Sequence, residues 1–157
     1  MLAALATLRQ CIENCSEAEW NQSHNDAPFS QVLFHTLFYT DLYLSDGRNE
    51  FKLQGFHKEN MDIFREYEEL EYRKAEELYT RGEIEKYFNF CHGKINSYFD
   101  IFNAGNLCEK SPHLDFTYLE LFIDVIRHIQ HHAAQLGLRM QQITGKELNW
   151  IASGWKI

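Results

Sequence analysis

Histidine is the residue type in this sequence whose number and spacing could do chemistry. Eight histidines occur among 157 residues. His128 and His132 are four residues apart in a stretch with helical periodicity, so their imidazoles lie one turn apart on one helix face. His35 lies within the apolar stripe of another predicted helix, so it points toward the protein interior. These three imidazoles could converge on one point.

Three converging imidazoles would form a site for one divalent metal ion. Each neutral ring offers one nitrogen lone pair at about 2.0–2.1 Å from a zinc-sized ion, which leaves a fourth position for water or substrate. We expect zinc or nickel, although imidazole nitrogens also suit copper and iron. His131 is adjacent to His132 but falls toward the solvent face, so we expect it to be exposed rather than a ligand.

The same histidines have a simpler interpretation as core residues. A single histidine on an apolar stripe is usually a hydrogen-bonded core residue. A pair of histidines four residues apart also arises by chance in a chain that is rich in histidine. From spacing alone, a metal site and a set of core histidines are about equally supported.

Other polar side chains near these histidines could support a site. Asp124 lies one turn before His128 and could orient an imidazole, although an aspartate at such a position is more often solvated. Tyr39 and Gln135 could hydrogen-bond a metal-bound water or could serve only in packing. Three further histidines are candidates for a fourth ligand or a pocket group, and the sequence does not select among them: His24, His92 and His113.

Composition limits the class of protein. A chain of 157 residues that is 45% hydrophobic can bury one sizeable core, so we expect a single domain over residues 1–157. A net charge of −8 without a basic cluster argues against a nucleic-acid partner. No apolar run approaches the roughly 20 residues of a membrane span, so we expect no membrane partner and a cytoplasmic location. Four cysteines without a CxxC pair favour reduced thiols.

The periodicity of the chain predicts an all-α fold. Helix-forming residues fill long stretches in which apolar residues recur every three or four positions, and only two prolines occur. Thr80 and Glu83 form a capping-box pattern, and a glycine is typical of a helix end. Four long helices are expected: about Leu2 to Cys15, Pro28 to Ser45, Thr80 to Phe102, and a fourth whose apolar repeat runs from Leu119 to Ile143 and ends at Thr144 and Gly145.

The middle of the chain is the least regular. We predict that the segment from Phe51 to Thr80 is a long crossover with a short helix around Ile63 to Leu78. Four long helices with one long middle connection predict a four-helix bundle with a long crossover between helices 2 and 3. In that arrangement helices 1 and 2 are antiparallel, and so are helices 3 and 4. Trp20, after the first helix, is expected to cover one end of the core.

The second predicted helix is apolar on more than one side. Leu33, Leu37 and Leu44 lie on the face opposite His35. A helix with two apolar faces can lie at a subunit contact as well as in the core. We therefore expect a homodimer.

Three stretches of the chain resemble the DinB/YfiT-like superfamily. FSQVLFHTLFYTDLYL resembles its second helix, RHIQHHAAQLGLRMQQ its last helix, and NWIASGW the tail that follows. The resemblance covers nearly all 157 residues, implies the same bundle with its long crossover, and implies that His35, His128 and His132 are metal ligands. Many members have Arg-Gly where this chain has Ala133 and Ala134, which puts the substrate class in doubt.

The resemblance also implies candidate activities. A bound divalent ion lowers the pKa of water or of a thiol, which permits hydrolysis or sulfur transfer. The first hypothesis is therefore a metal-dependent hydrolase or a thiol-dependent transferase that acts on an unidentified small molecule with a low-molecular-weight thiol as cosubstrate. The alternative is a non-catalytic metal-binding or stress-associated helical interaction module. In a third hypothesis the histidines are core groups and the protein is a helical scaffold.

Overall fold

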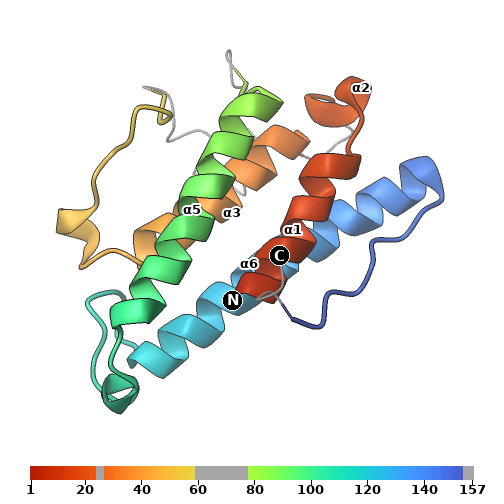
Figure 1. The fold of residues 1–157 in the computed structure, drawn as a ribbon. Helices are drawn as coiled ribbons and strands as arrows, with labels where there is room; N and C mark the ends of the chain where they lie inside the picture. The colour runs from red at the N-terminus through yellow and green to blue at the C-terminus, as the bar shows by residue number, and fades with distance from the viewer. Residues whose placement is uncertain (24–26, 59–77, 154–157) are drawn as a thin grey trace.

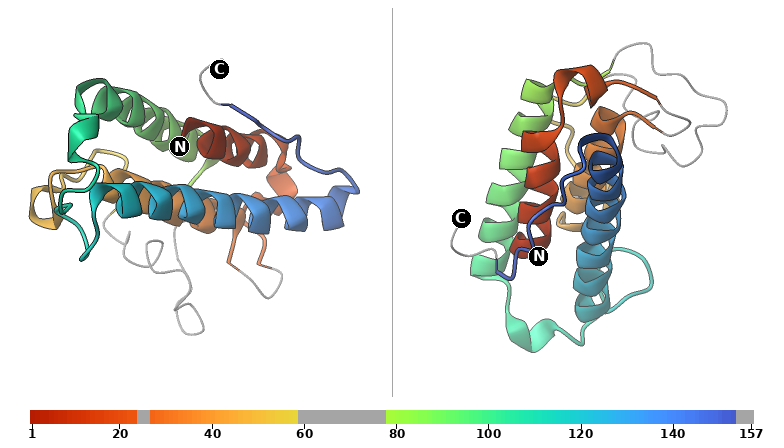
Figure 2. Two further views of the ribbon diagram at one scale, coloured as in Figure 1. Left: turned by 90° about the horizontal axis from the view of Figure 1, so that it is seen from below. Right: turned by 90° about the vertical axis from the view of Figure 1, so that its right-hand side faces the viewer.

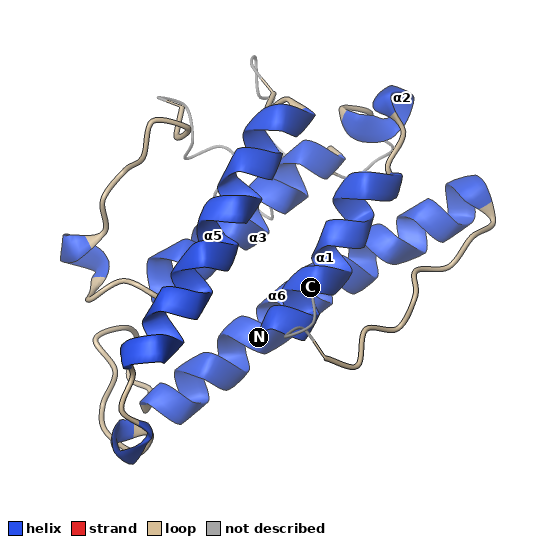
Figure 3. Ribbon diagram, in the orientation of Figure 1, coloured by secondary structure: helices blue, strands red, loops and turns tan. Residues whose placement is uncertain are grey.

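The computed structural model describes residues 1–23, 27–58 and 78–153, and within them the chain is all-helical (Figures 1 and 3). It contains no strand in these ranges, which confirms the predicted all-α class. The predicted short helix of the crossover falls on residues 59–77, outside the described residues, apart from Leu78, which is not helical. The α-helices are α1 (Leu2–Asn14), α2 (Glu17–Trp20), α3 (Phe29–Tyr43), α5 (Arg81–Ile101) and α6 (Tyr118–Thr144).

The four long helices pack around one core. α1 packs against α6 and α5, and α3 packs against the same two helices from the other side. α1 and α6 run in one direction, whereas α3 and α5 run in the opposite direction (Figures 1 and 2). Because α3 and α5 are parallel neighbours, α5 begins at the opposite end of the helix pair from the end of α3. None of the described helices is both long and apolar enough to span a bilayer.

Local capping sets the helix ends. Thr80 and Glu83 form the predicted capping box at the start of α5, and Thr117 and Glu120 form a second one before α6. In each box the threonine hydroxyl accepts the glutamate N–H, and the carboxylate accepts the threonine N–H, so two otherwise unpaired donors are satisfied. α6 ends where Gly145 adopts a φ of 72°, as a glycine allows.

Trp20 covers one end of the core, as predicted. Its side chain is 2% exposed, and its indole N–H donates to the carbonyl of Tyr79 at 2.9 Å. The guanidinium of Arg81 lies over the indole at 4.4 Å from the ring centroid. The sequence predicted a non-helical connection here, whereas the structure contains the single helical turn of α2. The hydroxyl of Ser16 caps this turn by accepting the N–H of Glu19.

α3 is buried on nearly all sides. Leu33, Leu37 and Leu44 are at most 3% exposed and belong to the core of the chain itself. The second apolar face of this helix therefore packs internally, because α5 and the segment after α3 cover it. These leucines do not supply the surface on which the homodimer prediction depended.

The apolar repeat of α6 predicts burial wrongly at both ends of the helix. Leu119 and Ile143 are 46% and 45% exposed, although the repeat predicts them to be inside. Leu121 and Val125, which the repeat omits, are buried. Ile143 lies in the last turn of α6.

A buried polar network holds α3 against α5. Asp41 is 1% exposed, and the Nζ of Lys94 donates to its Oδ1 at 2.5 Å and to its carbonyl at 2.7 Å. The hydroxyl of Tyr87 donates to Oδ2 of Asp41 at 3.1 Å and lies 3.1 Å from Nε2 of His57. Asp41 follows His35 by six residues, which is about 240° around the helix. Holding Asp41 against α5 therefore turns His35 toward α6.

Substitution of Lys94 by Met should destabilise the protein strongly. The Asp41 carboxylate would remain buried without its cation, a loss that typically costs about 3 kcal/mol or more. The double variant Asp41→Asn/Lys94→Met removes both charges and keeps an acceptor for Tyr87, so it should recover at least half of that loss. Urea unfolding of the three proteins measures the difference. Equal stability of the parent and Lys94→Met would show that the ion pair does not hold α3.

Candidate metal centre

The packing of α3 against α6 brings three histidines together. His35 comes from α3, and His128 and His132 come from successive turns of α6. Nε2 of His128 lies 3.0 Å from Nε2 of His35 and 3.1 Å from Nε2 of His132. The nearest ligand atoms of the three residues all lie within 4.8 Å of one another. All three rings therefore present a nitrogen to one small volume, as the spacing predicted.

Burial keeps His128 neutral. His35 and His132 are 6% and 1% exposed, and His128 is partly buried. Burial, together with the neighbouring imidazoles of His132, His35 and His131, lowers the pKa of His128 to about 3. A neutral imidazole keeps the lone pair that a metal ion requires. At neutral pH His128 thus offers a lone pair rather than a positive charge.

Gln135 holds the ring of His132 in place. Its Oε1 lies 3.1 Å from Nδ1 of His132. An amide oxygen can only accept a hydrogen bond, so Nδ1 carries the proton and Nε2 carries the lone pair that faces the other histidines. The sequence suggested a bond from Gln135 to a metal-bound water, whereas the structure places its oxygen on the outer nitrogen of the ring. Such an outer contact fixes the orientation of a ligand.

Tyr39 forms an aromatic wall of the cluster. Its ring centroid lies 4.9 Å from that of His35 and 5.6 Å from that of His128. Tyr39 is one turn after His35 on α3, so the same helix supplies a ligand candidate and its wall. The ring is partly buried and shields one side of the imidazoles from solvent.

Other predicted residues do not join the cluster. Within the described residues, Asp124 forms no hydrogen bond to the three clustered histidines. His131 is exposed, as predicted. His92 contacts Asn96 on α5, and His113 is buried with Nε2 donating to the carbonyl of Ser45 at 2.8 Å. His24 lies outside the described residues.

No further His, Cys, Asp or Glu among the described residues completes the cluster. The four cysteines there are free, and three of them are buried. Burial raises the pKa of the Cys11 thiol to about 12 and that of Cys15 to about 11, and it raises the pKa of Cys91 well above its ordinary value. These buried thiols are therefore protonated and unreactive at neutral pH. Three imidazoles on one side of a small volume can bind a divalent ion and leave its other side open to an added ligand.

Comparison with known proteins adds no assignment. No protein-family model, curated protein or solved structure matches this chain.

The metal-free protein should lose stability as the pH falls from 6.5 toward 3. In that range the unfolded chain protonates His128 at its ordinary pKa near 6.5, whereas the folded protein does so only near pH 3, so acid favours unfolding. At pH 5 this effect amounts to about 2 kcal/mol, at about 1.4 kcal/mol per pH unit. Chelator-treated parent and His128→Gln proteins should therefore differ in the slope of unfolding free energy against pH.

The exposed neighbour provides the control for this measurement. His131→Gln should keep the slope of the parent, because the exposed His131 does not belong to the buried cluster. The contributions of His57 and His113, whose pKa values burial also lowers, are common to all three proteins. A parent slope equal to that of His128→Gln would contradict a neutral, buried His128.

Proposed function

We propose that this chain is a divalent-metal-binding protein of the DinB/YfiT-like type, with His35, His128 and His132 as its ligands. The observation that carries the proposal is the convergence of three imidazole nitrogens within 4.8 Å. Imidazole nitrogens suit zinc and nickel. Burial supports the proposal further, because polar rings that are removed from water need partners, and a shared cation supplies one to each ring.

The helix arrangement agrees with this proposal. A DinB/YfiT-like bundle has four helices and one long crossover in the middle of the chain. Here α1 and α6 run opposite to α3 and α5, and the long connection joins the parallel pair α3 and α5. The two ligand helices, α3 and α6, are in direct contact. The proposed bundle therefore extends over residues 1–157 as one domain.

We propose further that the bound metal supports hydrolysis or thiol transfer. A divalent ion held by neutral donors keeps its full positive charge, and it lowers the pKa of a water or thiol that binds to it. His35, His128 and His132 hold the ion, Gln135 orients His132, and Tyr39 limits access by water from one side. No cysteine belongs to the cluster among the described residues, so a reacting thiol would come from a low-molecular-weight cosubstrate.

The alternative is a metal-binding or stress-associated module without turnover. Its ligands come from two helices that already pack together, so an ion would tie α3 to α6 and stabilise the fold. The two functions differ in whether the ion keeps an exchangeable position. Addition of a low-molecular-weight thiol to the cobalt-substituted protein should change the visible spectrum if the position is open and leave it unchanged if it is closed.

Metal content is the decisive measurement for the site. The purified parent, incubated with zinc or nickel at neutral pH and then desalted, should hold about one ion per chain by elemental mass spectrometry. His35→Ala, His128→Ala and His132→Ala should each lose most of it, because two imidazoles bind far more weakly than three. His131→Ala is the matched control and should keep the ion, since His131 is exposed beside the cluster.

Circular dichroism shows whether each of these variants remains folded. A folded parent that retains no ion would refute the metal site, as would variants of the three cluster histidines that bind as much metal as His131→Ala.

Gln135 should affect metal affinity without being a ligand. In Gln135→Leu the Nδ1–H of His132 loses its acceptor, so the ring is free to change tautomer and rotate. Loss of such an outer contact typically lowers metal affinity by about 10–100-fold. Competition with a chromogenic chelator measures the change, and Gln142→Leu, on the exposed face of the same helix, is the control. Equal affinity of Gln135→Leu and the parent would show that this contact does not orient the ligand.

A further inference from the structure

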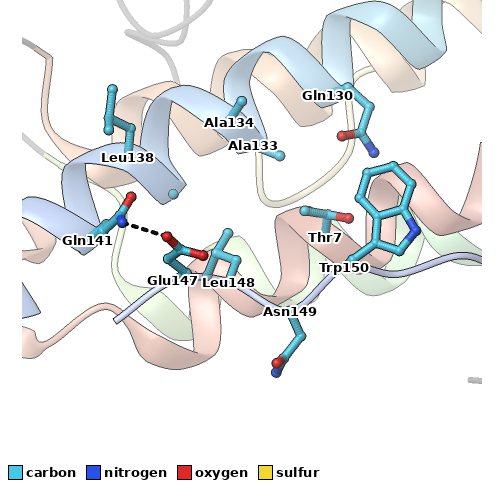
Figure 4. A pocket seen from close by; sticks show the side chains of 11 residues that line it. Thr7, Gln130, Ala133, Ala134, Leu138, Gln141, Glu147, Leu148, Asn149 and Trp150 are labelled. Atoms are coloured by element: carbon cyan, nitrogen blue, oxygen red, sulfur yellow. Dashed lines mark hydrogen bonds between the residues drawn. The ribbon is translucent and has the colours of Figure 1, made fainter. Parts of the chain in front are cut away.

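A second pocket lies on the far side of α6 from the histidines. The segment after α6 crosses α6 and α1 and leaves a cavity of about 320 Å³ between them (Figure 4). Gly137, which lines it, follows His132 by five residues, or about 140° around the helix. The pocket therefore opens on a different face from the metal centre. We call it the tail pocket; its lining residues are Thr7, Gln130, Ala133, Ala134, Gly137, Leu138, Gln141, Glu147, Leu148, Asn149 and Trp150.

Two specific contacts hold the tail over this pocket. The side-chain amide of Gln10 on α1 donates to the carbonyl of Asn149 and accepts its N–H, both at 2.9 Å. Leu148 packs against Gly137 so closely that a Cβ on this glycine would lie 2.8 Å from the Leu148 Cδ1. These contacts fix the tail at two neighbouring residues. The pocket is therefore formed by specific contacts between α1, α6 and the segment after α6.

The pocket combines an aromatic wall with polar ends. Trp150 is 86% exposed, and Figure 4 shows its indole beside Gln130 and Thr7. Within the described part of the chain, the carboxamide of Gln130 and the indole N–H of Trp150 have no hydrogen-bond partner. At the other end Gln141 donates to the carboxylate of Glu147 at 2.9 Å. The helix surface between the two ends carries Ala133, Ala134 and Gly137 beside Leu138, and these three small residues leave room for a ring.

The charges of the lining select the class of ligand. No Lys, Arg or His is among the lining residues, and the one charged group is the Glu147 carboxylate. A phosphate or carboxylate ligand would meet this negative charge without a compensating cation. A single aromatic wall does not enclose a cation as an aromatic cage does. The amide, hydroxyl and carboxylate groups suit a neutral ligand that carries both hydrogen-bond donors and acceptors.

We propose that the tail pocket binds a neutral, hydroxyl-bearing ring of about the size of one pyranose sugar. The apolar C–H face of such a ring packs on the exposed face of Trp150, and its hydroxyl edge bonds the neighbouring carboxamide of Gln130. The volume is at the lower end of the range for small-molecule sites. A single stacking wall and few polar contacts give affinities in the millimolar range.

Ligand-observed NMR tests this proposal at such affinities. Saturation-transfer spectra of the full chain with glucose, galactose and mannose should show binding of at least one sugar through its C–H protons. Trp150→Ala should weaken that binding at least tenfold, whereas Trp150→Phe should retain most of it. Glucose 6-phosphate should bind more weakly than glucose. His128→Ala should bind the sugar as the parent does, which separates this site from the proposed metal centre.

Trp150 is exposed, so its replacement should leave folding unchanged, and circular dichroism checks this. Gly137→Ala provides a second variant, since its methyl group would displace Leu148 and move the tail. Absence of a Trp150-dependent signal for all three sugars would overturn the proposal. Equal or tighter binding of the phosphorylated sugar would also overturn it.

Discussion

The contact between α3 and α6 is the interaction on which the rest of the structure depends. It places three polar rings in a region that is otherwise apolar, where a polar group without a partner is costly. The rings can partly satisfy one another, since an Nε2–H of His128 can point at the Nε2 lone pair of His132. A ring that donates this hydrogen has no lone pair left at Nε2, so a shared cation satisfies all three at once. The cost of burying them and the ability to bind an ion therefore have the same origin.

Contacts on the opposite side of α3 determine the rotation of this helix, and with it the direction in which His35 points. α3 is buried almost all round, so its rotation cannot be set by a simple division into apolar and solvated faces. The hydrogen bonds from Lys94 and Tyr87 to Asp41 set this rotation instead, because they fix the Asp41 side chain of α3 against α5. Gln135 does the same for one ring on α6. Directional hydrogen bonds thus provide the orientation that apolar packing leaves undetermined.

Sequence patterns predicted the helices and the clustered histidines because both depend on local periodicity. The capping pair Thr80 and Glu83, the glycine at the end of α6, and the spacing of His128 and His132 are all features within one or two turns. Such patterns could not predict contacts between distant segments of the chain. Asp41 and Lys94 are 53 residues apart, and Gln10 and Asn149 are 139 apart, so nothing in either neighbourhood pairs them. Leu33 and its neighbours were correctly judged apolar, but periodicity could not tell an internal contact from a subunit contact.

The separation of the ligands along the chain has a consequence for biosynthesis. His35 and His128 are 93 residues apart, so the cluster cannot exist until α6 has left the ribosome. The pair on α6 needs only its own helix, and two imidazoles one turn apart can capture an ion before α3 has docked. Metal present during synthesis would then favour the pairing of α6 with α3 over competing collapsed states, because only that pairing supplies the third nitrogen. The ion would act as a template for the docking of α3 on α6.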